Sequence, residues 1–570
     1  MQRNLNTLAD KQFDIVIVGG GIFGACAAWD AALRGLSVAL VERHDFCSGA
    51  SANSFKIVHG GIRYLQHGDL ARLRASCKER TAFLRIAPHL VQPLPIVVPT
   101  YGHGKMGKAF LGAGMLIYDV LTFERNRTIK DPARKIPWTQ FLNRQQIRDL
   151  FPDLQHDRLT GGVIFFDGQM YNPMRLVLSF IKSAVEYGAK VANYVEAIGF
   201  LRSDDRIEGI EARDVLTGNA FAIRAKVVLN AAGPWAEKLL NKGIGIDLKP
   251  QGVYSRDAAF VISRRLPGNY ALAVSGRTRD PDAVLSRPAR HLFVVPWREY
   301  SLVGVWHKVY AGEPDEVTLD EGDLQSFIDE INWAYPALDL SRADVLMWNY
   351  GLVPFGENEA GAVNLSYGKR SYLIDHEKSH GIQGLVTLIG IRYTMARGDA
   401  SRALDLAVAK LGRSIPPPPT DRIPIQGGKI EDFEQFVNAT AHDPIGVNKG
   451  AIRALIHNHG TAYKRILRYA EEDPSLAETL NGSTVLKAEV LNAVHNEMAI
   501  KLSDIVFHRT DLATGGNPGE PALRTCAQMV ARELGWAAER MEKELREIRA
   551  RFPALQTPAQ HDPRIIKFPR

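Results

Sequence analysis

Cysteine is scarce in this sequence, and the few cysteines form no recognisable pattern. The chain has 570 residues and four cysteines, with no Cys-x-x-Cys pair: Cys26, Cys47, Cys77 and Cys526. Zinc knuckles need closely spaced cysteines, and disulfide scaffolds need many of them in a short chain. We therefore expect neither a metal site nor a disulfide framework.

Long apolar runs are also missing. No stretch of about 18 consecutive apolar residues occurs, so no membrane-spanning helix is expected. The polar N-terminal segment leads directly into a strand pattern, so we expect no signal peptide and a cytoplasmic protein. The formal net charge is only +7. A solvated basic surface accounts for this charge, with attraction to anionic substrates or lipid headgroups as the alternative, and we expect no nucleic-acid partner.

Length and composition are those of an ordinary globular protein. Hydrophobic residues make up 45% of the chain and charged residues 23%. A chain of this length is expected to fold into two or three domains with an ample core.

The most informative feature is a glycine-rich turn between two buried-strand patterns. Phe13–Val18 is a short β-branched run, residues 22–34 have helical spacing, and Gly19, Gly21 and Gly24 fit G-x-G-x-x-G. In such a unit the first glycine makes the tight turn, the second admits a pyrophosphate, and the third lets helix and strand pack closely. The N-terminus of the helix attracts the phosphates.

An acidic residue follows at the expected place. A second strand pattern, Ser37–Val41, ends in Glu42, about 20 residues beyond the turn, where an acid can accept hydrogen bonds from a ribose diol. The order of strand, turn, helix, strand and acid predicts a dinucleotide site. The motif leaves NAD and FAD open, whereas the acid disfavours the 2′-phosphate of NADP.

Later segments predict that the nucleotide-binding domain is discontinuous. Residues 225–240 form another strand, small-residue turn and helix, while residues 251–346 contain alternating patterns typical of an antiparallel sheet. We predict an α/β fold with a Rossmann-like domain built from residues 1–250 and 347–412. Residues 251–346 would form an antiparallel β cap domain that carries substrate contacts.

The C-terminal part has a different character. Residues 413–428 include four consecutive prolines and predict an extended linker. Residues 429–570 predict a helical domain, more suited to packing or interaction than to chemistry. One face of its last helix would carry Trp536, Met541, Leu545, Ile548 and Phe552.

Several blocks together resemble the FAD-dependent, membrane-associated glycerol-3-phosphate dehydrogenases, which have the D-amino-acid-oxidase-like flavoprotein fold. The blocks are GGGIFGACAAWDAALRGLSVALVER, HGGIRYLQHGDL, NAAGPWAEKLL, VVPW and VFHRTDLATG. The resemblance covers nearly the whole chain. It implies FAD with its ADP half at Gly19, Gly21, Gly24 and Glu42. It also implies that the isoalloxazine lies near Ser54, His59, Gly60, Gly61, Gly390 and Thr394.

The expected substrate pocket departs from that family. The family usually carries an arginine where this chain has Val353, and a lysine where it has Arg392. A family G-T-T-D block reads GVWH here, with Trp306 and His307. The histidine of a family G-S-H block is missing, because the matching stretch is Asp257–Ala259.

Two arginines remain where the family binds its anionic substrate. Arg63, beside Tyr64, and Arg392 can each clamp a phosphate or carboxylate with two hydrogen bonds. The alternative for each is an arginine without a substrate role. We therefore expect a small anionic substrate bound by Arg63, Tyr64 and Arg392, with Trp306 as an aromatic wall.

Oxidation of an alcohol by a flavin also needs a base for the hydroxyl proton. His307 is the first candidate, and a structural histidine is the alternative. His59 is the second candidate, although its neighbouring glycines favour a flavin-orienting role. We therefore predict that His307, Arg63 and Arg392 carry the catalysis.

The function expected from the resemblance is oxidation of a secondary alcohol on glycerol 3-phosphate, or on a related polyol phosphate or hydroxy acid. Hydride would pass to flavin and electrons to quinone. An amine or amino-acid oxidase of the same fold, a flavin-binding relative without activity, and a nicotinamide dehydrogenase are the alternatives.

A segment with mixed apolar and basic residues points outward. Residues 101–127 contain Phe110, Leu111, Met115, Leu116 and Ile117 together with Lys105, Lys108, Arg125 and Arg127. Such a segment can lie in a bilayer interface, and the matching region of the resembling family anchors the enzyme to the membrane. We expect peripheral contact with the inner face of the cell membrane. The alternative is a buried helix, and Gly112 and Gly114 weaken the expectation of a regular amphipathic one.

Overall fold

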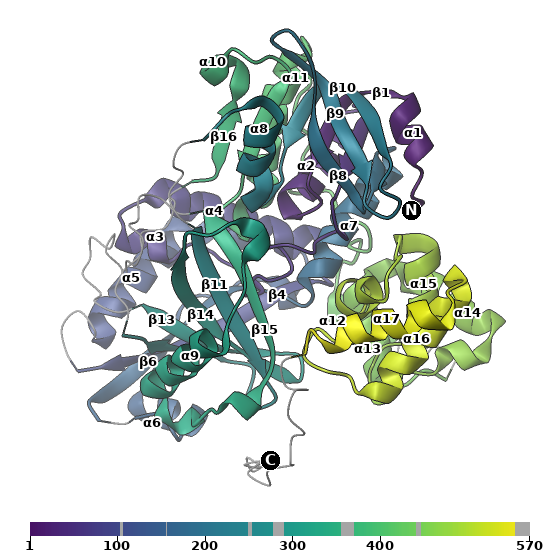
Figure 1. Ribbon diagram of the computed structural model, residues 1–570. Coiled ribbons are helices and arrows are strands. Elements are labelled where there is room, and N and C mark those ends of the chain that lie inside the picture. The colour runs from purple at the N-terminus through teal and green to yellow at the C-terminus, as the bar shows by residue number, and fades with distance from the viewer. Residues whose placement is uncertain are drawn as a thin grey trace.

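The computed structural model describes residues 1–102, 107–155, 157–248, 254–277, 290–354, 370–440 and 446–552. Two sheets and a group of C-terminal helices make up the molecule, and the C-terminal helices gather on one side (Figure 1). Lys105 and the predicted domain boundary between residues 250 and 251 lie outside the described residues.

The first sheet has a parallel centre. Its strand order is β16-β17-β10-β1-β2-β7, with β9 pairing with β10 and β8 pairing with β9. The strands are β1 (Gln12–Val18), β2 (Val38–Val41), β7 (Lys190–Ala192), β8 (Val195–Ser203), β9 (Arg206–Asp214), β10 (Ala220–Asn230), β16 (Tyr372–Asp375) and β17 (Leu385–Ile389). Strands β17, β10, β1, β2 and β7 run parallel. The sheet is therefore assembled from segments that lie far apart in the sequence, as expected.

Helices cover both faces of this sheet. On one face, α2 (Ile22–Leu33) packs against α7 (Pro173–Glu186) and α11 (Ala396–Lys410). The short alanine side chains of α2 allow this close packing, and Trp29 meets Phe180 edge-on at 5.4 Å. On the other face lies a second core that includes α1 (Leu5–Asp10) and α8 (Ala236–Ile244).

The second sheet is mostly antiparallel. Its order is β15-β11-β14-β13-β12-β4-β6-β3, with β5 paired to β6 and with β12 parallel to β4. The strands are β3 (Ile57–Val58), β4 (Val91–Tyr101), β5 (Gln140–Leu142), β6 (Leu159–Met170), β11 (Tyr254–Ile262), β12 (Ala271–Ser275), β13 (His291–Trp297), β14 (Tyr300–Tyr310) and β15 (Val345–Pro354). This sheet therefore draws strands from before residue 251 and after residue 346. The domain boundaries stay a prediction.

Most of the remaining helices of this part of the chain lie around the second sheet, whereas α10 (His376–His380) packs against β16 and β17 of the first sheet. The others are α3 (Arg63–Gln66), α4 (Leu70–Ile86), α5 (Lys108–Leu121), α6 (Arg144–Leu150) and α9 (Glu321–Ala334). Helix α4 begins at an aspartate cap, Asp69, whose carboxylate accepts from the Arg72 N–H. Within the described part of the chain, no helix has the length and apolar character needed to cross a bilayer.

The C-terminal part is helical, as the sequence predicts. After the irregular segment 413–428 come α12 (Phe433–Thr440), α13 (Lys449–His459), α14 (Tyr463–Glu472), α15 (Lys487–Glu497), the π-helical segment η11 (Asp504–Arg509), α16 (Glu520–Leu534) and α17 (Ala538–Arg549). Leu545, Ile548 and Phe552 enter one buried cluster, whereas Trp536 and Met541 pack at its edge.

Candidate active site

A cavity of about 1890 Å³ is lined by residues of both sheets and of the C-terminal helices. Pockets for small ligands usually measure about 300–1,000 Å³, so this one has room for a dinucleotide and a substrate. Its walls include most of the predicted site residues: Gly19, Gly21, Glu42, Ser54, His59, Gly61, Arg63, Tyr64, His307, Gly390, Arg392 and Thr394. Gly24, Gly60 and Trp306 do not line it.

The parallel strands explain why these positions meet. Gly19, Glu42, Ala231 and Gly390 are the residues that directly follow β1, β2, β10 and β17, and all four line the cavity. Carboxyl ends of parallel strands share one edge of a sheet, which is where ligands bind in such folds.

The glycine turn has no room for side chains. Gly19 has a φ of +109°, and a Cβ there would lie 2.5 Å from the Ala231 carbonyl oxygen. A Cβ on Gly24 would lie 1.9 Å from the Gly19 carbonyl oxygen. Gly24 therefore packs helix against strand and leaves the cavity to Gly21, the N-cap residue of α2. The turn and the helix N-terminus fit a pyrophosphate group.

Glu42 is fixed by backbone donors. One carboxylate oxygen accepts from the Gly20 N–H at 2.7 Å, and the other accepts from the His44 N–H at 2.9 Å. Burial raises the pKa of Glu42, and these two hydrogen bonds oppose the shift. Each carboxylate oxygen has a further lone pair, so both can still accept from a ribose diol.

The region expected to face the flavin has an unmet hydrogen-bonding capacity. Ser54 Oγ is buried and has no hydrogen-bond partner among the described residues. Such an atom is costly unless a ligand pairs with it. Thr394 Oγ1 accepts from the His59 N–H at 2.9 Å and so joins two distant segments of the cavity wall. A Cβ on Gly390 would lie 2.0 Å from the Phe23 ring, so this glycine is needed for packing as well.

The His59 side chain is exposed to the cavity and pairs with a buried ion pair behind it. Its Nδ1 lies 3.1 Å from Asp167 Oδ2, and the other oxygen of Asp167 accepts from Arg80 at 3.0 Å and from the Gly60 N–H at 2.6 Å. Burial alone would raise the pKa of Asp167, but His59, Arg80 and the Gly60 N–H lower it below its usual range.

Gly60 has a role different from the one expected. A Cβ on this residue would lie 2.1 Å from the Arg80 guanidinium, so the glycine makes room for the arginine. Gly60 therefore supports the network behind the wall, while Gly61, with a φ of +80°, forms the wall itself.

One of the two predicted substrate arginines, Arg392, packs against Tyr64. Arg392 lies 4.8 Å from the centre of the Tyr64 ring, and Arg72 lies at the same distance from it. Burial raises the pKa of Tyr64, while the charges of Arg392, Arg72 and Arg63 oppose this shift. Arg63, Tyr64 and Arg392 all line the cavity, so this wall is strongly cationic and suits an anion.

His307 is paired with an acid that the sequence reading did not select. The register of β11 and β14 places Asp257 opposite His307, and His307 Nδ1 lies 2.8 Å from Asp257 Oδ1. The Ser255 hydroxyl also donates to this oxygen. Two separate departures from the family pattern thus meet in the structure as one histidine–aspartate pair on the cavity wall.

Trp306 does not support the substrate contact expected of it. Successive side chains of a strand point to opposite faces, so Trp306 faces away when His307 lines the cavity. Its ring stacks on Phe327 of α9, with centres 5.9 Å apart. Val353 of β15, which stands where the family has an arginine, does line the cavity.

The sequence reading also missed Lys56. Its side chain is buried in the cavity wall, with Nζ 3.4 Å from the Ser54 carbonyl oxygen and 4.8 Å from the centre of the Trp297 ring. Burial, together with the charge of Arg298, lowers the pKa of Lys56 to about 7. In the sequence, a single lysine within a strand pattern does not indicate that its side chain is buried. Asp167 and Asp257 were missed because their partners are distant in the sequence.

Comparison with known proteins agrees with the fold and the cavity. The family described as FAD dependent oxidoreductase matches residues 14–387, and the C-terminal domain of alpha-glycerophosphate oxidase matches residues 418–541. The chain therefore belongs to the FAD-dependent oxidoreductases of this family. FAD is its cofactor, and the glycine turn, Glu42 and the unpaired Ser54 hydroxyl fit that group.

Several proteins that are similar to this chain are named glycerol-3-phosphate dehydrogenase. A glycerol-3-phosphate dehydrogenase of Synechocystis is 32% identical over 95% of this chain and 97% of its own length. The mitochondrial glycerol-3-phosphate dehydrogenase of Mus musculus is 30% identical over 94% of this chain and 72% of its own. A glycerol-3-phosphate dehydrogenase from Bacillus halodurans, solved with FAD, shares the fold at a TM-score of 0.73, 24% identity, and 96% and 95% coverage. The resemblance read from the sequence is confirmed.

Proposed function

We propose that this enzyme oxidises the secondary alcohol of glycerol 3-phosphate or of a closely related polyol phosphate or hydroxy acid. The observation that carries the proposal is that Arg63, Tyr64 and Arg392 line the cavity that also contains the pair of His307 and Asp257. The similar proteins from Synechocystis and Mus musculus are named for glycerol 3-phosphate.

FAD would lie along the cavity with its ADP half at the glycine turn and Glu42. Its ring system would lie near Ser54, His59, Gly61 and Thr394, which line the same cavity. Bound FAD supplies the two-electron acceptor for the C–H bond that breaks. The protein's own groups bind the anion, orient the alcohol and take the hydroxyl proton.

The anion would be held by Arg63 and Arg392. Losing one partner of a buried charged contact costs roughly 2–5 kcal/mol, so Arg63→Ala and Arg392→Ala should each raise KM for the substrate by about 30-fold or more. A suitable control is Arg74→Ala, because Arg74 pairs with Glu124 and does not line the cavity. Unchanged KM in both cavity variants would show that the anion binds elsewhere.

His307 would accept the proton of the alcohol. When Nδ1–H donates to Asp257, Nε2 is the ring nitrogen that can take a proton, and Asp257 then stabilises the imidazolium. The pair thus orients one tautomer and compensates the positive charge that forms.

The substrate class is the first thing to test, because Val353 replaces the arginine expected from the family pattern. An arginine clamp would also suit the carboxylate of an amino acid, which keeps an amino-acid oxidase as the second candidate. Flavin bleaching under anaerobic conditions should be screened with polyol phosphates, hydroxy acids and amino acids. Bleaching by polyol phosphates supports the proposal, whereas bleaching by amino acids alone, with peroxide formed in air, contradicts it.

A peripheral membrane contact through α5 and its surroundings would bring the cavity close to quinone in the membrane, which would serve as the electron acceptor. Large apolar side chains are exposed there: Phe110, Leu116, Ile117, Val120, Phe123, Trp138 and Phe141. The ring of Phe141 lies against Gly112, so this glycine serves packing within a regular helix. Phe110 and Ile117 also line the cavity, so an apolar acceptor entering here would reach it.

Vesicle binding tests this contact. Val120 and Phe123 are 65% and 68% exposed, so Val120→Asp and Phe123→Asp should weaken co-sedimentation with anionic phosphatidylglycerol vesicles. The matched control is Val215→Asp, at an exposed valine that is 40% accessible and lies outside α5. Equal vesicle binding by all three variants would exclude this surface as the membrane contact.

A further inference from the structure

We propose that the C-terminal helical domain secures the ADP end of the cofactor site, through the buried ion pair between Asp45 and Arg509. The proposal rests on the placement of the ADP half at the glycine turn and Glu42. It gives this domain a part in holding the cofactor, beyond the packing role expected from its sequence.

The first step is that residues 42–47 are fastened to the glycine turn. Gly20 donates its N–H to Glu42 at 2.7 Å, and its carbonyl oxygen accepts from the Cys47 N–H at 3.0 Å. A Cβ on Gly20 would lie 2.8 Å from the Phe46 ring. The turn and the 42–47 segment are therefore in close contact along their length, and a shift of one must displace the other.

The second step is that the C-terminal domain holds the middle of this segment. Both terminal nitrogens of Arg509 donate to Asp45, at 2.6 and 2.7 Å. His508 Nδ1 lies 2.8 Å from the same carboxylate, and Asn193 donates to it at 2.9 Å. Asp45 and Arg509 are 2% and 1% exposed. Burial would raise the pKa of Asp45, but Arg509 and His508 hold it well below its usual range.

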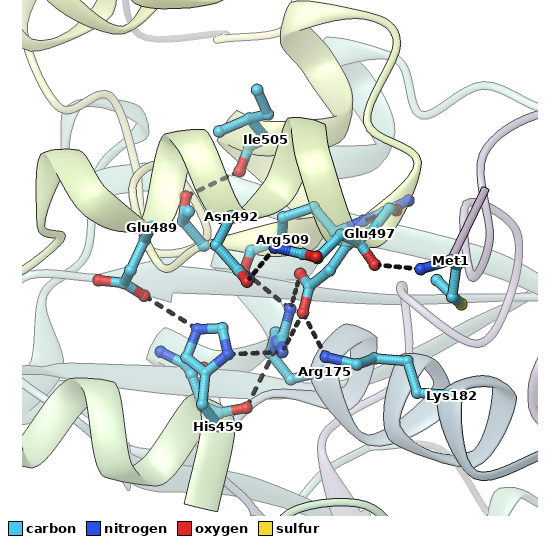
Figure 2. A network of polar contacts seen from close by, with 12 residues as sticks. Met1, Arg175, Lys182, His459, Glu489, Asn492, Glu497, Ile505 and Arg509 are labelled. Atoms are coloured by element: carbon cyan, nitrogen blue, oxygen red, sulfur yellow. Dashed lines mark hydrogen bonds and ion pairs between the residues drawn. The ribbon is translucent and has the colours of Figure 1, made fainter. Parts of the chain in front are cut away.

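The third step is that Arg509 is itself held firmly. Its Nε donates to the Glu497 carbonyl oxygen at 3.0 Å, and the Glu497 carboxylate accepts from Arg175 at 2.6 Å and from Lys182 at 2.7 Å. Figure 2 shows these side chains converging from α7 and from the C-terminal helices. A bidentate pair anchored in this way transmits the position of the domain to the 42–47 segment.

Part of this support faces the cavity, although Arg509 itself does not line it. Asp45, Asp504 and His508 line it together with Glu42. The carboxylates of Asp45 and Asp504 and the ring of His508 are close enough to hold a metal ion. The carboxylate oxygens, however, already accept hydrogen bonds from Arg509, from the Tyr194 hydroxyl at 2.5 Å and from backbone N–H groups. The cluster therefore works as a hydrogen-bonded support.

The test is the rate of FAD release from the holoenzyme, followed by the rise in flavin fluorescence. The paired variant Asp45→Asn with Arg509→Met removes both charges, so neither is left buried and unpaired. We expect release to be about tenfold faster, the ratio that corresponds to a coupling of about 1.4 kcal/mol. Wild-type release from a folded paired variant would overturn the proposal.

Two further variants separate the explanations. Arg134→Met removes a buried cation that lies 4.5 Å from the centre of the Phe433 ring of α12, at the same domain interface but outside the network that holds Arg509, and we expect it to leave FAD release unchanged. Faster release in this control as well would assign the effect to general loosening and overturn the proposal. Glu42→Gln should speed release if the ADP half lies at the turn. Faster release in Glu42→Gln but not in the paired variant would reject the domain's role alone.

Hydrogen exchange on the wild-type protein tests the same coupling without any substitution. Coupling between sites is reciprocal, so removing FAD should lower the protection of the amides of η11, whereas α12, which packs against Asp131 and Arg134, should change little. Equal protection of η11 with and without FAD would overturn the proposal.

Discussion

Two histidine–aspartate pairs line the same cavity, and their surroundings differ. Asp167, the partner of His59, is 2% exposed and also accepts from Arg80 and the Gly60 N–H. The Asp257 side chain, the partner of His307, is 23% exposed, and a serine hydroxyl is its second donor. A guanidinium therefore balances the charge of Asp167, whereas the second hydrogen-bond donor to Asp257 is a neutral hydroxyl.

The difference distinguishes a structural role for the His59 pair from a catalytic role for the His307 pair. Arg80 balances the charge of Asp167 and, together with the Gly60 N–H, holds its carboxylate in place behind the wall. Asp257 has no such guanidinium among its hydrogen-bond partners in the described chain, so it can stabilise an imidazolium on His307. We infer that the His59 pair shapes the wall of the cavity and that the His307 pair takes the proton.

The largest expected effect is therefore that of His307→Asn. Loss of a general base typically costs about 10²–10⁴ in rate, and we expect kcat/KM for the substrate to fall by that factor. The parallel variant His59→Asn should lower kcat less than tenfold, while FAD binds more weakly. Comparable losses of kcat in the two variants would erase the distinction between the pairs.

The second effect concerns stability. Asp167→Asn leaves Arg80 buried beside a neutral amide, and breaking such a pair costs about 3–5 kcal/mol. Urea unfolding of the purified protein should show a loss of about 3 kcal/mol in the free energy of unfolding. If the loss stayed below about 1 kcal/mol, Asp167 would not be the buried support described here.

The third effect is a loss of activity with little loss of stability, the opposite of what we expect for Asp167→Asn. Asp257→Asn weakens a hydrogen bond to a charged group, which is worth about 1.5–3 kcal/mol, and should lower kcat about 10- to 150-fold. Its free energy of unfolding should change by less than about 1 kcal/mol, because the side chain is partly exposed. A variant that lost stability but kept its kcat would assign Asp257 to structure.

The cofactor side of the cavity could be predicted from the sequence because its signals are local. Gly19, Gly21 and Glu42 fall within one strand–helix–strand unit, and spacing alone indicates what they form. The same holds for the last C-terminal helix, whose apolar periodicity is visible within a single segment. The parallel sheet and the helical C-terminal part were expected on these grounds.

The substrate side could not be predicted in the same way, because its contacts join distant strands. Asp257 and His307 meet only through the register of β11 with β14. Trp306 was placed in the pocket with His307, although neighbours on one strand point to opposite faces. The contact of Asp45 with Arg509 spans most of the chain and leaves no trace in either segment. Likewise, the family pattern gave no reason to expect strands before residue 251 in the second sheet.

A third histidine, His457, extends the comparison to a ring with no acidic hydrogen-bond partner among the described residues. His457 is buried, stacks on Tyr171 with ring centres 4.1 Å apart, and has its Nδ1 2.8 Å from the His89 carbonyl oxygen. Burial, with the charges of Arg134 and Arg453, lowers the pKa of His457 to about 3, although the bond to His89 opposes this.

The smallest predicted effect is the resulting dependence of stability on pH. The unfolded chain protonates His457 near its ordinary pKa of about 6.5, whereas the folded protein resists protonation down to about 3. Its contribution to stability is therefore complete above pH 6.5 and is lost as pH falls toward 3, by at most about 1.4 kcal/mol per pH unit. His457→Phe should flatten the fall in unfolding free energy between pH 6.5 and 5, whereas His495→Gln, at a solvent-exposed ring, should not. An unaltered slope in His457→Phe would mean that His457 already takes up a proton in the folded protein, as a histidine beside an acid can.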